Sequence, residues 1–427
     1  MTRIALVRLA DILRFAAAAL CSVLLQNNVF AQAQIINRVA GNGYAPYRGE
    51  GGPAIQAQIV ADSLAVDHRG NVYLSDFDAN FIRVIDGRTG IVTTYAGTGQ
   101  TGFNGDGLPA LMTNIGFPKA LAIDADDNLI IAEQAPSRIL KVNHQSLTVE
   151  TLVGTDVKTW DDIVHNGGAS LNSGDGASAK LASIGAPDDL AVDTDDNLYI
   201  AAVGLIRRVD HKTGIITTVA GGGIPGAYGS PASGPATAAA LNEPSFVAIG
   251  PRNEVYFGDQ ASRNVRRLDR KTNTFSTIAG VREQDWMFVF NGDGIPATQA
   301  TLLQPVHITF DCVGNLTIPD LYRVRQVDGE TGIIHTIAGA GGSGVSTGDG
   351  GLALQATFSN LIQAVYAPDG SLYLLDGSGY VRRVSGFTGT RNWDCRDERR
   401  YHGYDPEGPD RHWHHQHDHD GHNHEQR

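Results

Sequence analysis

The chain has 427 residues, of which 42% are hydrophobic and 19% charged, so it can bury a large core and is not disordered in bulk. Its formal net charge of -13 at pH 7 argues against a protein whose main ligand is nucleic acid, because phosphate binding needs clustered Lys and Arg. The 51 glycines follow no period of three, which favours a fold with many turns over a collagen-like one.

Residues 1–31 have the three-part pattern of a secretory signal peptide. Arg3, Arg8 and Arg14 precede the apolar run 15–25, and small residues stand before the expected cleavage site at Ala31. The apolar run is too short to cross a bilayer, which needs about 20 residues. An organelle transit peptide or a short anchor is the alternative. We therefore expect a secreted protein, periplasmic or extracellular, with no membrane span in the mature chain.

One short strand pattern, of the type IVTTYAG, occurs six times. Its closing glycine is spaced at intervals of 56, 57, 67, 59 and 59 residues. Each copy precedes a glycine-rich loop, a short helix with Pro at its start, a hairpin with an Asp/Gly/Asn turn, and a third strand. The closing glycines are Gly41, Gly97, Gly154, Gly221, Gly280 and Gly339.

Four strands repeated six times predict an all-β fold, a six-bladed β-propeller over residues 35–390. The chain begins this region with a single outer strand at 35–41, and the last repeat ends after its third strand near Val384. We expect the first strand to complete the last blade, which would close the ring and remove its open edges. An open β-solenoid would leave these complementary ends without a purpose.

The repeat motifs resemble those of a known family. The series TIAG, GDG-x-PA, LAVD-x-x-GN-x-Y and IR-x-VD is similar to the NHL repeat, in the long-loop version of bacterial secreted proteins and teneurins. The resemblance spans residues 35–390 and implies a propeller. NHL propellers serve as protein-binding, RNA-binding or sensor domains, and a few relatives are enzymes.

Acidic residues recur on the rim where the long loops gather. Because they repeat with the blades, we expect them to satisfy turn N–H groups and to cap the helices that follow. The repeated third-strand arginines are expected to contact carboxylates of the scaffold. The loop acids are Glu50, Asp106, Asp175, Asp293 and Asp349, and the acids ending the second strands are Asp76, Glu133, Asp259, Asp320 and Asp376.

Residues that break the repeat are better candidates for function. At the start of the inner strands the chain carries a variable and mostly polar set, which we expect to form a ligand-binding channel mouth. A lone histidine in this set does not predict a zinc site, which needs several ligands. The candidates are Asp62, Lys119, Asp188, Asp189, Ser245, His307 and Gln363.

Aromatic residues on two long loops predict an interaction surface for a protein or glycan partner. They are Trp160 and His165 in the third interval, and Trp286 and Phe288 in the fifth. Packing into the channel as a plug is the alternative.

Residues 391–427 differ in composition and are expected to form a disordered tail. The mature chain keeps Cys312 and Cys395, which we expect to form a disulfide that fixes the start of this tail under the ring. The tail is rich in histidine, which predicts loose binding of Zn, Cu or Ni. The candidate ligands are His412, His414, His415, His417, His419, His422 and His424.

The sequence therefore predicts a monomeric propeller that acts as a binding or interaction module through its loop-rich face, with no certain cofactor. The alternative is a propeller lyase or lactonase with its site at the channel mouth around Asp188, Asp189 and His307. A third possibility is structural decoration of a cell envelope, without a small-molecule site.

Overall fold

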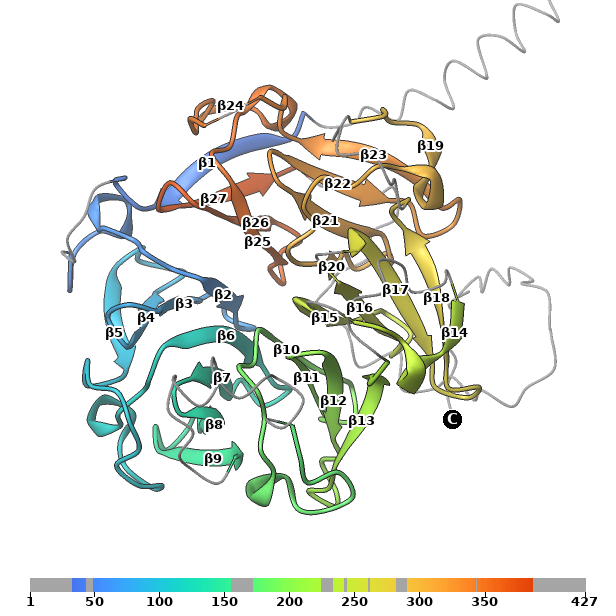
Figure 1. Ribbon diagram of the computed structural model, residues 1–427. Coiled ribbons are helices and arrows are strands. Elements are labelled where there is room, and N and C mark those ends of the chain that lie inside the picture. The colour runs from blue at the N-terminus through green and yellow to red at the C-terminus, as the bar shows by residue number, and fades with distance from the viewer. Residues whose placement is uncertain are drawn as a thin grey trace, which may run out of the picture.

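In the computed structural model, six antiparallel sheets surround a central axis as blades (Figure 1). Each sheet has four or five strands. The fold is therefore the six-bladed β-propeller that the repeat predicts. The structure describes residues 33–43, 49–154, 172–223, 233–241, 244–259, 262–281, 290–342 and 344–386.

The first three blades each consist of four consecutive strands. Blade 1 contains β2 (Ser63–Val66), β3 (Val72–Asp76), β4 (Phe81–Ile85) and β5 (Val92–Ala96). Blade 2 contains β6 (Pro118–Ile123), β7 (Leu129–Gln134), β8 (Ser137–Val142) and β9 (Val149–Val153). Blade 3 contains β10 (Asp189–Val192), β11 (Leu198–Ala202), β12 (Leu205–Val209) and β13 (Ile216–Gly221).

The other three blades carry an additional short strand at the outer edge. Blade 4 contains β15 (Phe246–Ile249), β16 (Val255–Asp259), β17 (Asn264–Asp269), β18 (Thr274–Ala279) and β14 (Ser233–Pro235). Blade 5 contains β20 (Thr309–Phe310), β21 (Leu316–Asp320), β22 (Arg323–Val327), β23 (Ile333–Ala338) and β19 (Ile295–Pro296). Blade 6 contains β25 (Leu361–Tyr366), β26 (Leu372–Asp376), β27 (Tyr380–Ser385), β1 (Ile35–Ala40) and β24 (Gly351–Leu352).

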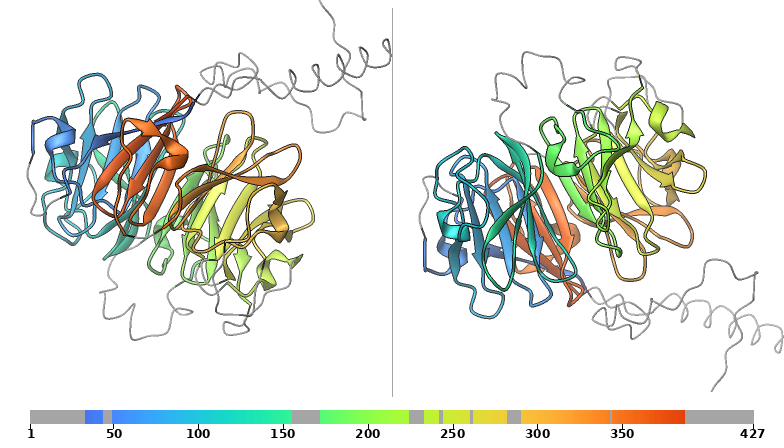
Figure 2. Two further views of the ribbon diagram at one scale, coloured as in Figure 1. Left: turned by 90° about the horizontal axis from the view of Figure 1, so that it is seen from above. Right: turned by 90° about the horizontal axis from the view of Figure 1, so that it is seen from below.

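Strand β1 lies in the same blade as the last strand of the described chain. It pairs antiparallel with β27, with Ile36 opposite Val384 and Arg38 opposite Arg382. Figures 1 and 2 show the blue β1 beside the red-orange β27. Blade 6 thus joins residues that are 350 positions apart in the sequence, as in the hydrogen bond from the Ser385 hydroxyl to the Ile35 carbonyl.

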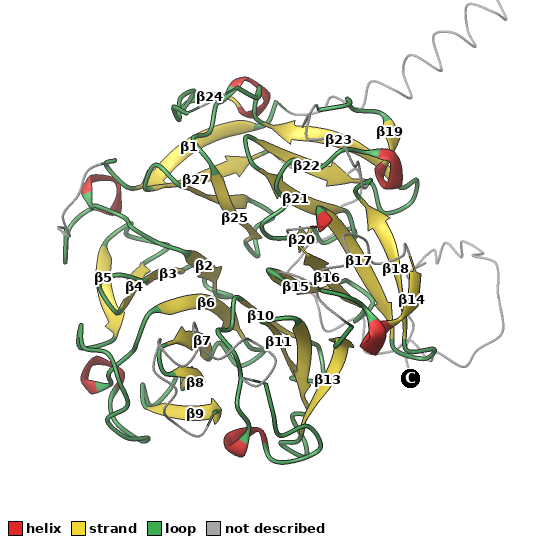
Figure 3. Cartoon of the chain, viewed as in Figure 1, coloured by secondary structure: helices red, strands yellow, loops and turns green. Residues whose placement is uncertain are grey.

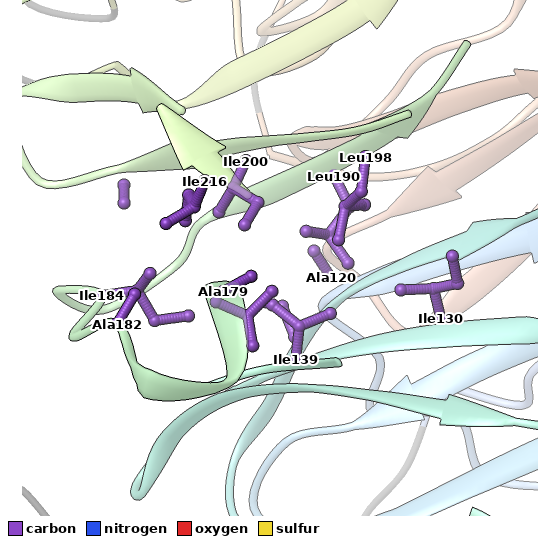
Figure 4. Packing of buried hydrophobic residues seen from close by; sticks show 13 residues of the cluster. Ala120, Ile130, Ile139, Ala179, Ala182, Ile184, Leu190, Leu198, Ile200 and Ile216 are labelled. Atoms are coloured by element: carbon purple, nitrogen blue, oxygen red, sulfur yellow. The ribbon is translucent and has the colours of Figure 1, made fainter. Parts of the chain in front are cut away.

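The apolar core is divided among the spaces between neighbouring blades. One cluster joins Ile130 and Ile139 of blade 2 to Leu190 and Ile200 of blade 3 (Figure 4). Each blade presents apolar side chains on both faces because its strands lie between two neighbours. A blade is therefore stable only when neighbours cover both of its faces.

The short helices predicted after the glycine-rich loops are single turns of 3-10 helix. Their first residue is a buried alanine. In five of the six turns its carbonyl accepts from the glycine that closes the preceding outer strand, as Ala110 does from Gly97. Figure 3 shows these turns at the outer perimeter of the ring. They are η1 (Ala54–Gln56), η2 (Ala110–Met112), η4 (Ala179–Leu181), η5 (Ala236–Ala238), η7 (Ala297–Gln299) and η8 (Ala353–Gln355).

We predict that Ile36→Ala lowers the free energy of unfolding by about 3 kcal/mol, within the range for deleting a fully buried Ile side chain. Ile36 is 0% exposed and packs with Leu372 and Val384 of blade 6. Ile216→Ala is the matched control, because Ile216 has the same place in a blade built from consecutive strands. Urea unfolding should give similar losses for both variants, and a negligible loss for Ile36→Ala alone would contradict the shared blade.

Candidate functional site at the channel mouth

The inner strands of the blades begin at the mouth of the central channel. These strands lie at the free edge of their sheets, so part of their backbone N–H and C=O groups faces away from the ladder. The repeat places a different side chain at one equivalent position near the start of each inner strand. In blade order these residues are Ser63, Ala120, Asp189, Phe246, His307 and Gln363.

Three of these side chains connect one blade to the next. The Ser63 hydroxyl accepts from the Leu121 N–H at 3.1 Å. The Asp189 carboxylate accepts from the Val247 N–H at 3.0 Å. In blade 6, the Gln363 amide oxygen accepts from the Leu64 N–H at 2.5 Å. Asp189 and Gln363, two of the predicted ligand-binding residues, therefore also hold neighbouring inner strands together.

The mouth brings Asp189, His307 and Gln363 together. Gln363 Nε2 lies 3.3 Å from His307 Nε2, and Asp189 Oδ2 lies 3.8 Å from the same nitrogen. His307 precedes the two-residue strand β20, so its backbone lies outside the ladder of blade 5. Within the described chain, His307 Nδ1 is buried without a hydrogen-bond partner.

Burial shifts both titratable groups of this cluster toward their uncharged forms. It lowers the pKa of His307 to about 4. Burial raises the pKa of Asp189 to about 7, and the N–H groups of Val247 and Leu190 act in the opposite direction. Near neutral pH the imidazole is therefore uncharged, and the Gln363 amide donates to its Nε2.

A second, more accessible group lies between blades 1 and 2. Lys119 Nζ is 3.8 Å from Asp62 Oδ1, and both side chains are 33% exposed. The ammonium group also lies 5.8 Å from the centre of the Phe77 ring, which packs against Phe117 at 5.2 Å. This group offers a cation, a carboxylate and a half-buried aromatic pair to solvent.

Asp188 extends this second group toward blade 3. Its carboxylate accepts from Gln134 Nε2 at 3.2 Å. Gln134 follows Glu133 at the end of β7, just as Phe77 follows Asp76, the last residue of β3. Sequence reasoning missed Phe77, Gln134 and Phe117, although the variation of the residue after each strand-end acid was a usable signal.

Below the mouth, the channel contains a cavity of about 290 Å³. Its lining is mainly aliphatic, with Leu64, Leu121 and Val247 among its side chains, and His307 and Gln363 also line it. The volume is at the lower end of the range of about 300–1,000 Å³ that is typical of small-molecule sites. The polar mouth thus opens onto a channel whose lining side chains are mainly aliphatic.

The repeated loop acids belong to the scaffold. Asp175, Asp293 and Asp349 pair with the buried arginines Arg207, Arg325 and Arg382 of the third strands.

In the first two blades the loop acid bonds a threonine of the outer strand, as Asp175 and Asp293 also do through Thr218 and Thr336. Glu50 accepts from Thr94, and Asp106 accepts from Thr151. The described helices have no side-chain cap, as η2 shows, so the prediction that these acids cap helices was wrong. The carboxylates that we expected to cap the helix instead accept hydrogen bonds from the outer strand or pair with the arginine of the third strand.

The acids that end the second strands are also used locally. Asp76 and Asp376 accept backbone N–H groups of their own turns, from Ala79 and Ser378. Glu133 bonds the buried Arg138 at 2.7 Å, and burial raises its pKa to about 7. In the described residues no group of three or more His, Cys, Asp or Glu side chains is arranged to hold a metal ion.

The remaining predicted residues lie apart from this cluster or outside the described chain. Ser245 lies half-buried just before β15, and its hydroxyl has no partner within the described part of the chain. Cys312 is in the turn between β20 and β21, and its disulfide with Cys395 stays a prediction. Outside the described residues lie Trp160, His165, Trp286, Phe288, Cys395 and the tail histidines 412–424.

Comparison with known proteins supports the fold class. No protein-family model matches the chain. It is 25% identical over 296 residues to Protein SUPPRESSOR OF QUENCHING 1, chloroplastic, of Arabidopsis thaliana, covering 67% of this chain and 26% of that protein. It is 24% identical over 365 residues to Teneurin-m of Drosophila melanogaster, covering 78% of this chain and 12% of that protein. The chain thus spans only a minor part of either relative.

Two solved structures share the architecture. A Bacteroides thetaiotaomicron protein of unknown function superposes with a TM-score of 0.58 at 18% identity, covering 83% of this chain and 76% of that one. An auxiliary nutrient binding protein from Bacteroides ovatus superposes with a TM-score of 0.56 at 15% identity, covering 83% and 77%. These likenesses show the fold.

The chain is thus a β-propeller protein, and its relatives in sequence include a teneurin. The finer assignment to NHL repeats stays a prediction. In the described segments, no helix is long and apolar enough to cross a membrane.

We predict that Arg382→Met destabilises the protein by about 3–5 kcal/mol, because it leaves buried acceptors without their donor. Arg382 is fully buried and donates to Asp349 and to the carbonyls of Thr347 and Thr357. Asp349→Asn is the control and should cost about 1 kcal/mol or less, since that side chain is 36% exposed. Equal losses of unfolding free energy for the two variants, measured by urea unfolding, would contradict the structural role of the buried arginine.

We also predict that Asp189→Asn stabilises the protein more at pH 8 than at pH 5. The folded-state pKa of about 7 exceeds that of an unfolded Asp, so ionisation of Asp189 destabilises the fold as the pH rises from about 4 to 7. The Asn oxygen can still accept from Val247. Thermal unfolding across this range should show a gain of about 2 kcal/mol at pH 8, and a gain that does not depend on pH would contradict the assignment.

Proposed function

We propose that this protein is a secreted binding module that recognises its ligand through the loop-rich face, at the channel mouth. The proposal rests on the difference between two sets of side chains on this face: the repeated ones bond within the blades, and the ones that break the repeat gather at the mouth. The repeated loop acids are used by arginines and threonines of the blades, as in the pair Asp293–Arg325. The residues that break the repeat gather at the mouth, where Lys119 and Asp62 remain partly exposed.

The chemistry of the mouth suits a glycan. A sugar ring has an apolar face, which packs on aromatic side chains, and hydroxyl groups, which bond carboxylates and amides. Phe77 and Phe117 offer the aromatic surface, and Asp62, Asp188 and Lys119 offer polar groups within the same region. A structural neighbour that is a nutrient-binding protein agrees with a binding role for this fold. A protein partner is the other occupant that this surface would accept.

The enzymatic alternative, a propeller lyase or lactonase, rests on the contact between Asp189 and His307. Two observations favour binding over this alternative. The Asp189 carboxylate already accepts from Val247, and its side chain is only 6% exposed.

Residues 391–427 are proposed to bind Zn, Cu or Ni loosely through their histidines, as the composition predicts.

We predict that Phe77→Ala and Lys119→Ala each weaken glycan binding by about tenfold, equivalent to about 1.4 kcal/mol. The measurement is binding of the mature protein to an array of immobilised oligosaccharides, followed by titration calorimetry with the strongest ligand. Lys212→Ala, in an exposed turn on the opposite face, is the control and should bind like the native protein.

Two results would overturn this proposal. One is binding that survives both mouth substitutions. The other is turnover of the bound sugar that is lost in Asp189→Asn and His307→Gln while binding remains, which would establish the enzymatic alternative.

A further inference from the structure

A groove separates blades 4 and 5 on the side of the hairpin turns, away from the channel mouth. Its volume is about 420 Å³, within the range of about 300–1,000 Å³ that is typical of small-molecule sites. Its apolar lining includes Tyr256, Phe310, Leu316 and Val327, and the Tyr256 and Phe310 rings lie 4.7 Å apart. The groove thus has an aromatic floor that the proposed glycan site at the mouth does not use.

The interface between blades 3 and 4 shows how a side chain fills the equivalent position. Arg270, in the turn after β17, donates to the Tyr199 hydroxyl at 3.1 Å and to the Asn253 carbonyl at 3.0 Å. One blade later, Gly329 stands at the position of Arg270, and Tyr256 takes the place of Tyr199. Gly329 lines the groove and has no side chain that could reach across it. The groove therefore lies where an arginine crosses the preceding interface.

The interface between blades 5 and 6 is closed in a different way. There the Tyr366 hydroxyl lies 2.9 Å from the Thr317 hydroxyl oxygen and accepts from Gln326 Nε2 at 3.1 Å. In the groove, Phe310 stands at the position of Tyr366, and Arg267 stands at that of Gln326. Because Phe310 has no hydroxyl, blade 5 offers Arg267 no equivalent acceptor at this position.

One end of the groove has two guanidinium groups beside a single carboxylate. Glu254 lies 3.6 Å from both Arg252 and Arg267, which is too far for a hydrogen bond. The two arginine side chains are 78% and 43% exposed. Burial and the Glu254 carboxylate raise the pKa of Tyr256, so its hydroxyl stays protonated and donates to Glu254 at 3.4 Å. This end of the groove thus keeps N–H donors directed to solvent.

The acid at the other end of the groove is held in its own turn. Asp328 accepts from the Thr331 N–H at 2.7 Å, from the Thr331 hydroxyl at 2.8 Å and from the Glu330 N–H at 3.1 Å. These bonds lower the pKa of Asp328 and fix its carboxylate in the turn between β22 and β23. The arginine end therefore has one positive charge in excess.

We propose that the groove binds an aromatic carboxylate, a small molecule with a planar ring and one acid group. The ring packs on Phe310 and Tyr256, because aromatic rings favour stacked or edge-to-face contacts with one another. The carboxylate accepts from Arg252 and Arg267, whose planar guanidinium groups match the geometry of this anion. The groove lies away from the channel mouth, so the proposal is independent of ligand binding there.

The test is titration calorimetry of the mature protein with 3-phenylpropanoate. Two matched compounds serve as controls, the amide of the same acid, which lacks the charge, and propanoate, which lacks the ring. We expect 3-phenylpropanoate to bind at one site with a Kd of about 1 mM or tighter. The amide should bind about tenfold more weakly, and propanoate should show no binding in the same range.

Arg252→Gln with Arg267→Gln should weaken the binding of 3-phenylpropanoate about tenfold and remove its preference over the amide, because the carboxylate loses its charged donors. Blade 5 already has Gln326 at the position of Arg267, so the new side chain fits a blade. Arg69→Gln with Arg88→Gln, in exposed turns of blade 1, is the matched control and should bind like the native protein.

Thermal unfolding of each variant separates the loss of the site from the loss of the fold. If the double variant unfolds, Arg252→Gln alone decides, because this side chain is 78% exposed; it should weaken binding about threefold. No binding of 3-phenylpropanoate, equal affinities for the acid and its amide, or unchanged affinity in the arginine variants would each overturn the proposal. Loss of binding in Phe77→Ala would place the acid at the channel mouth and would also overturn it.

Discussion

Packing between blades is the constraint on which the rest of this structure depends. Each blade has two apolar faces, and a neighbour must cover both. The pairing of β1 with β27 places the first and last strands of the described chain in one blade, so that blade 6 has its outer strand. Contacts of β25 with β21 on one side and with β2 on the other join blade 6 to blades 5 and 1. In the described part of the chain, each blade thus contacts a neighbour on both sides.

This constraint decides which polar residues are available for function. Each blade buries an arginine of its third strand, and in blades 3, 5 and 6 a loop acid pairs with that arginine, as Asp349 does with Arg382. Even at the mouth, Ser63 and Gln363 bond the next inner strand. What remains partly accessible is the group around Lys119 and Asp62, together with the aromatic pair beside it. The ligand-binding site is therefore sought among residues whose side chains do not hold the blades together.

The sequence predicted the blades well because each strand carries its own period and turn signals, repeated six times. It also predicted that the repeated acids are structural, but it assigned their partner wrongly, since Asp106 bonds Thr151 of the outer strand instead of a helix N-terminus. The pair of Phe77 with Phe117 depends on a contact between different blades. Such contacts have no fixed spacing in the chain, so they emerged only from the fold.

The central claim is that repeated rim residues build the ring and that departures from the repeat bind the ligand. A single-substitution scan measures it most directly, with thermal stability and oligosaccharide binding recorded for every variant. The account predicts two separate sets. Changes at Arg207, Arg325 and Arg382 should lower stability alone, and changes at Phe77 and Lys119 should lower binding alone. Loss of binding without loss of stability on changing the repeated loop acids would contradict it.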